Sequence, residues 1–126
     1  MRSLASLLLV LAAGGLTGAC AYARAIPIGA PAPARPPDCP LAYARLDPVE
    51  LQTQWREVGD VCVSAGTGFS HMTIDDVYEP GTPHDLLTER ACALGGQMVT
   101  PVGLCSNGKS SAIEFGVYVA RGGELP

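Results

Sequence analysis

Residues 82–105 read TPHDLLTERACALGGQMVTPVGLC, and this stretch contains the signals that decide the fold class. Its first half predicts a helix over residues 83–94, with Thr82 at the N-cap and Pro83 at the first helical position. Gly95 is expected just past the helix end, where glycine commonly adopts a left-handed conformation. The helical period turns one set of apolar side chains toward a core. These side chains are Leu86, Leu87, Ala91 and Leu94.

Alternating apolar residues predict three strands around this helix. They cover residues 58–64, 97–105 and 113–121. In the second strand, Val99 and Cys105 are expected on one face. Pro101 lies inside the same strand and indicates an edge or a β-bulge, because proline cannot donate to a sheet ladder.

Two further segments are ambiguous. Residues 47–54 begin like a helix but are few, and the long polar loop 65–81 could contain another strand. The order of the clear elements is β-α-β-β. This order predicts a small α+β domain over residues 41–126, with one helix packed on a small sheet.

The five cysteines suit a lipid anchor and two disulfides. Setting Cys20 aside leaves an even number, as expected in an oxidising compartment. Cys62 and Cys105 are expected on the sheet face away from the helix, and Cys92 on the solvent side of the helix. Cys39 ends a Pro-rich stretch and is free to cross over that helix. This arrangement favours Cys62–Cys105 and Cys39–Cys92 over the other two connectivities.

The N-terminus has the layout of a secretory signal peptide over residues 1–19. One positive charge precedes the apolar run 4–13, and small residues follow it. The sequence LTGAC at residues 16–20 is similar to a bacterial lipobox, which predicts acylation of Cys20. The alternative is ordinary cleavage after Ala23, which would leave no anchor.

Residues 20–40 are expected to form a lipid-anchored, Pro-rich linker. Six prolines fall in this stretch, and proline fixes φ and removes a hydrogen-bond donor. The expected form is extended, as a spacer between the membrane and the domain.

Charge and motifs exclude several classes of function. The 126 residues contain 8 Lys+Arg and 12 Asp+Glu, for a net charge of −4, which argues against a nucleic-acid partner. No catalytic signature or C-x-x-C is present, so we expect no enzyme, no cofactor, no metal site and no small-molecule substrate. A solvated loop is expected over the polar residues, with two alternatives: a Ser/His/Asp set and a weak Ca²⁺ site. The Ser/His/Asp set comprises Ser64, Ser70, His71, Asp75 and Asp76. The Ca²⁺ site would comprise Asp75, Asp76 and Glu79. His71 and His84 are also candidate metal ligands beside the cysteines.

Three short stretches of the domain carry a resemblance to a known family. They are residues 57–62 (EVGDVC), 87–91 (LTERA) and 94–99 (LGGQMV), followed by Cys105. In this order, behind a lipobox and a Pro-rich segment, they resemble the outer-membrane lipoprotein sensor of the Rcs envelope-stress phosphorelay and related small lipoproteins of unknown function. The resemblance implies a lipid-anchored α+β domain with two disulfides. The family's last two cysteines have no counterpart in residues 106–116 of this chain. In the family, one of these two cysteines pairs with the cysteine that matches Cys62.

The expected function is therefore that of a non-catalytic bacterial envelope lipoprotein. Palmitate-type lipid on Cys20 would hold it at the outer membrane, and a periplasmic domain would bind envelope proteins or sense stress. The alternatives are a structural envelope lipoprotein without signalling, or a small secreted periplasmic protein. Tyr118 and Glu114 are expected on the sheet face away from the helix and are the candidate contact residues. Alternatively, Tyr118 packs under the loop 65–81.

Overall fold

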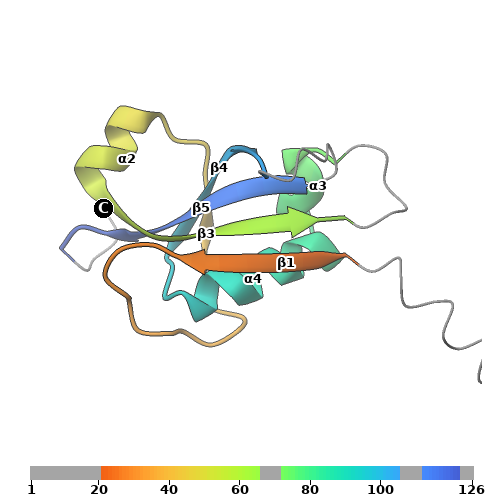
Figure 1. The fold of residues 1–126 in the computed structure, drawn as a ribbon, viewed down its shortest axis with the longest axis horizontal. Coiled ribbons are helices and arrows are strands. Elements are labelled where there is room, and N and C mark those ends of the chain that lie inside the picture. The colour runs from red at the N-terminus through yellow and green to blue at the C-terminus, as the bar shows by residue number, and fades with distance from the viewer. Residues whose placement is uncertain (1–20, 66–71, 106–111, 123–126) are drawn as a thin grey trace, which may run out of the picture.

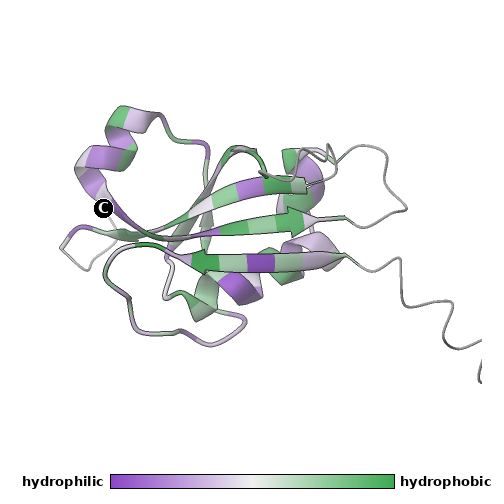
Figure 2. Cartoon of the chain, in the orientation of Figure 1, coloured by the Kyte–Doolittle hydropathy of each residue, from purple (hydrophilic) through white to green (hydrophobic). Residues whose placement is uncertain are grey.

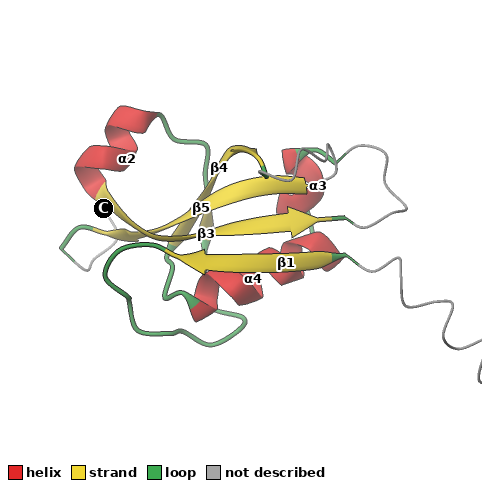
Figure 3. Ribbon diagram, in the orientation of Figure 1, coloured by secondary structure: helices red, strands yellow, loops and turns green. Residues whose placement is uncertain are grey.

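The computed structural model describes residues 21–65, 72–105 and 112–122, which form a five-stranded sheet with helices packed against it (Figure 1). Its elements, in chain order, are β1 (Tyr22–Pro27), β2 (Ala42–Tyr43), α2 (Pro48–Gln54), β3 (Trp55–Ser64), α3 (Ile74–Tyr78), α4 (Thr82–Ala93), β4 (Met98–Leu104) and β5 (Ala112–Ala120). The strand order is β1-β3-β5-β4-β2, and every neighbouring pair is antiparallel except the parallel pair β2 and β4. The predicted α+β class is confirmed (Figure 3).

The main core lies between α4 and one face of the sheet. Alternation along β3 and β5 turns Val61, Val63, Phe115 and Val117 to this face, where all four are fully buried. Leu87 of α4 packs into the same cluster. In Figure 2 the two central strands β3 and β5 are largely hydrophobic, as burial by helices on their faces requires.

The helix α4 begins and ends close to the prediction. It covers Thr82–Ala93, with Leu94 at the C-cap and Gly95 next at a φ of 80°. The expected capping by Thr82 is wrong, because Gly81 is the N-cap and no side chain caps the helix there. Pro83 lies in the first turn, where its missing N–H removes no hydrogen bond.

The expected spacer at residues 20–40 is wrong for the part that the structure describes. Tyr22–Pro27 forms the edge strand β1, paired along its whole length with β3. The chain then stays on the domain, since Ile28 N donates to Val58 O (3.1 Å) and Arg35 N to Cys92 O (2.8 Å). Pro27 is compatible with β1 because it stands last in an edge strand. The folded domain therefore begins at the first described residues, not at residue 41.

Each of the two ambiguous segments contains a helix. Residues 48–54 form α2, whose N-cap Asp47 accepts a hydrogen bond from Glu50 N (2.9 Å). The 65–81 loop contains the short helix α3, started by a capping box between Thr73 and Asp76. None of the helices in the described ranges has the length and apolar content needed to cross a membrane.

A β-bulge in β4 changes which face its later residues occupy. The pairing of β4 with β5 shifts between Pro101 and Gly103, as the proline indicated. Before the bulge Val99 faces α4 and is fully buried, so its expected place on the face of Cys105 is wrong. After the bulge Gly103 lies opposite Glu114, which is also the partner of Cys62. Cys105, two residues further, thereby reaches the face of Cys62.

Candidate functional site

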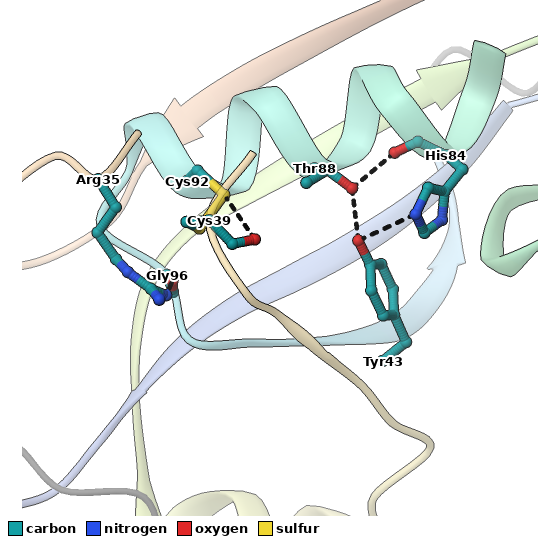
Figure 4. Close-up of a disulfide and its surroundings, with 7 residues drawn as sticks. All are labelled: Arg35, Cys39, Tyr43, His84, Thr88, Cys92 and Gly96. Atoms are coloured by element: carbon teal, nitrogen blue, oxygen red, sulfur yellow. Dashed lines mark hydrogen bonds between the residues drawn. A yellow bond between two sulfur atoms is a disulfide. The ribbon is translucent and has the colours of Figure 1, made fainter. Parts of the chain in front are cut away.

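Both expected disulfides are present. Cys62 bonds to Cys105 and Cys39 bonds to Cys92, each pair with its Cα atoms 5.9 Å apart. Cys92 is fully buried although its side of α4 was expected to face solvent. The segment that contains Cys39 crosses the helix there and covers it (Figure 4).

Hydrogen bonds tie the same segment to both ends of α4 (Figure 4). Arg35 Nη1 donates to the carbonyl of Gly96, beyond the C-terminal end of the helix. Nearer the N-terminal end, Tyr43 Oη lies 3.4 Å from His84 Nε2 and also hydrogen-bonds Thr88 Oγ1. His84 Nδ1 faces the Val77 carbonyl at 3.1 Å and must donate to it. Both ring nitrogens of His84 are therefore engaged within the fold, which leaves none for a metal.

Tyr118, a candidate contact residue, is buried. Only 7% of its surface is exposed, and it packs with Trp55 and Met98 beneath α2. A Cβ atom on Gly116 would lie 2.6 Å from the tyrosine ring, so the ring lies directly over that glycine. The expectation of a contact surface at Tyr118 is wrong, and among the described residues its cover includes Leu51 of α2.

Glu114 lies in a carboxyl cluster on the part of this face that α2 leaves open. Asp60 of β3 is close to the carboxyl groups of Glu57 and Glu114. Its Oδ1 atom is buried and has no hydrogen-bond partner. Desolvation by burial and the neighbouring Glu57 raise the pKa of Asp60 to about 7. Burial and Asp60 also raise the pKa of Glu114.

The cluster can exchange one proton near neutral pH. A carboxylate cannot donate, so the buried oxygen of Asp60 gains a partner only when one carboxyl group in the cluster is protonated. Burial, together with the charges of Glu57 and Asp60, also raises the pKa of Tyr118 to about 12. The position of Asp60 on this face could have been predicted from the sequence, although our prediction did not include it. Asp60 lies two residues from Cys62 in the same strand and therefore on the same face.

The other polar residues weighed from the sequence are used locally or lie outside the description. Asp75 forms an ion pair with Arg45 at 2.9 Å, and Asp76 caps α3. Ser64 is buried. Within the described ranges no three His, Cys, Asp or Glu residues are grouped to hold a metal ion. The candidates Cys20, Ser70 and His71 lie outside the described residues.

The chain has distant structural similarity to a solved protein. No family model and no curated protein matches the chain. A solved structure that does match is the crystal structure of a Francisella virulence factor, FvfA, in its orthorhombic form. The two share 17% sequence identity with a TM-score of 0.46, over 79% of this chain and 96% of that chain.

Proposed function

We propose that this protein is a non-catalytic bacterial envelope lipoprotein, held at the outer membrane through Cys20, whose disulfide-bonded domain binds proteins or senses envelope stress. The observation that supports it most is the use of the cysteines. Cys39, Cys62, Cys92 and Cys105 are all consumed in two disulfides, which leaves Cys20 as the odd thiol in the lipobox-like sequence. Disulfides also suit an oxidising compartment such as the periplasm.

Exposed apolar side chains next to Cys20 support the same proposal. Only Ala21 separates Cys20 from β1, so a lipid on Cys20 would hold β1 close to the bilayer. Tyr22 and Ile26 lie on the same face of β1, with Arg24 between them, and are 47% and 49% exposed. Tyrosine and aliphatic side chains at this position suit the headgroup region of a bilayer. In this arrangement the domain lies directly on the membrane surface instead of on a long tether.

Acylation is tested by metabolic labelling and fractionation. We expect the wild-type protein to take up an alkyne analogue of palmitate and to fractionate with the outer membrane. Cys20→Ala should be unlabelled and appear in the soluble periplasm. Its fold should be unchanged, because the four cysteines of the domain still pair.

The matched control is the double variant Cys39→Ala/Cys92→Ala, which removes one disulfide but keeps Cys20 and should remain labelled. An unlabelled and soluble wild-type protein would contradict the anchor and leave a secreted periplasmic protein. Cross-linking in intact cells then separates two roles of an anchored protein. A discrete inner-membrane regulator supports sensing, whereas barrel proteins or cell-wall material alone support the structural alternative.

A further inference from the structure

A cavity of about 640 Å³ lies where the segment after β1, the start of β3 and the end of β5 meet. Arg35, Arg56 and Arg121 all line it, and none of its lining residues is acidic. The described part of the chain contains six arginines and no lysine, so half of its fixed cations border this one cavity. The whole chain has a net charge of −4, which makes such a gathering of positive charge unexpected.

Each of the three guanidinium groups donates a hydrogen bond to a backbone carbonyl group. Arg56 Nη1 donates to Ala30 O (2.6 Å), Arg121 Nε donates to Gln52 O (3.1 Å), and Arg35 donates to Gly96 O. A guanidinium has five N–H donors, so each arginine retains donors for a ligand. Because a carbonyl group is neutral, it does not balance the positive charge of the arginine that donates to it. The ion pair found among the described residues joins Arg45 to Asp75, neither of which lines the cavity.

Fold stability alone does not explain this gathering. Arg56 pairs with Val119 across β3 and β5, and Arg121 follows the end of β5 in a turn. Positive charges gathered at one cavity repel one another and oppose folding when nothing compensates them. Arg35 beyond the C-terminus of α4 has a structural reason, because a cation there suits the helix dipole. That reason does not extend to the other two arginines.

We propose that this cavity binds a phosphate group of a ligand through Arg35, Arg56 and Arg121. Guanidinium forks match the oxygens of phosphate and can contact two of them at once. Three cations match a phosphate monoester or diphosphate, which has two or more negative charges, better than a single carboxylate. The phosphate can belong to a soluble compound or to a lipid headgroup. This site needs no lipid on Cys20 and goes beyond the proposed envelope function.

The first test is calorimetric titration of the full protein, purified from whichever cell fraction contains it, with sodium pyrophosphate. We expect saturable binding that weakens as salt is added, and no comparable binding of acetate at equal ionic strength. Arg56→Gln and Arg121→Gln should each weaken binding about tenfold, the loss expected for one charge-assisted contact. Arg24→Gln is the matched control, because Arg24 is exposed on β1 and does not line the cavity.

A second titration separates the sources of the phosphate. Vesicles of phosphatidylglycerol in phosphatidylcholine are compared with phosphatidylcholine alone, again with the Arg56→Gln and Arg24→Gln variants. Binding of either pyrophosphate or anionic vesicles that depends on Arg56 supports the site and names the source. Failure of both, or equal affinities in wild type and Arg56→Gln, overturns it. Thermal unfolding by circular dichroism shows that each variant is folded.

Discussion

At the scale of single residues, Asp60 is the most unusual group in the domain. It lies in the middle of β3, between the edge strand β1 and the central strand β5, with Ile26 and Gly116 as its cross-strand partners. Burial removes water that would otherwise stabilise its ionised form, and the neighbouring Glu57 repels its charge; both raise the pKa of Asp60, and a hydrogen bond with Glu114 offsets only part of this rise. The ionised state of Asp60 therefore costs the folded protein free energy.

This cost predicts a stability that falls with rising pH. The pKa of Asp60 is about 7 when folded, against 3.8 for an unperturbed group. The folded state therefore binds more protons between these values. The stabilisation is complete below about pH 4 and is lost as the pH rises through about 7. Asp60→Asn should raise the free energy of unfolding at pH 8 by about 1 kcal/mol, a value reduced because solvent screens this partly exposed group.

Urea unfolding at pH 5 and pH 8 measures this effect. The gain from Asp60→Asn should shrink at pH 5, where the wild-type carboxyl is itself largely protonated. Asp38→Asn is the control, since Asp38 is exposed and distant in sequence from the cluster. A wild-type protein that is equally stable at both pH values would show that Asp60 ionises normally.

At the scale of elements, the end of α4 is fixed by the segment that follows β1. Gly95 has a φ of 80°, which favours glycine, and a Cβ atom there would lie 2.5 Å from Pro33 O and 2.7 Å from Ala32 Cβ. The same stretch of chain donates from Arg35 N to Cys92 O. The backbone at the end of α4 therefore packs directly against the backbone of the Pro-rich segment, with no room for a side chain at residue 95.

Gly95→Ala should destabilise the domain by about 2 kcal/mol or more, because it adds a steric clash to the left-handed strain of about 1 kcal/mol. The matched control is Gly29→Ala. Gly29 has a similar φ of 67°, but the nearest atom to its Cβ position is 3.9 Å away. Chemical denaturation compares the two variants. Equal losses would mean that the Pro-rich segment does not pack against the helix end.

At the scale of the whole molecule, the two disulfides join different parts of the fold. Cys39–Cys92 binds the N-terminal segment to α4, and Cys62–Cys105 joins β3 to the end of β4 across the face away from α4. A domain of this size has a small core, so covalent links contribute much of its stability. Both links close long loops, with sequence separations of 53 and 43 residues.

Removing Cys39 and Cys92 together by alanine substitution should lower the free energy of unfolding by up to ~4 kcal/mol, the chain-entropy value for such a loop. Cys62→Ala/Cys105→Ala is the matched comparison and should cost a similar amount, because its loop is nearly as long. Urea unfolding measures both losses. Peptide mapping without reduction checks the connectivity, and a peptide linking Cys39 to Cys62 would contradict it.

The amino-acid sequence by itself determined the elements whose signals are local. The helix over 82–93 follows from its apolar period and from Gly95, all within one short stretch. The strands β3 and β5 follow from alternation, and the bulge in β4 follows from Pro101. The disulfide pairing was also predicted correctly, although Cys105 reaches the face of Cys62 through the bulge in β4 and not by the simple alternation that we counted.

Only the tertiary structure decided the features that depend on distant partners. β1 is a strand because β3 provides a free edge with which it pairs. From the sequence, the prolines that follow β1 favoured an extended linker there instead. Tyr118 is buried because α2 folds over it, and Cys105 faces Cys62 because the bulge in β4 reverses the alternation. Arg35, Arg56 and Arg121 are far apart along the chain and border one cavity only after the sheet has formed. The physical reason is that pairing and packing energies depend on long-range register, which no local pattern of residues encodes.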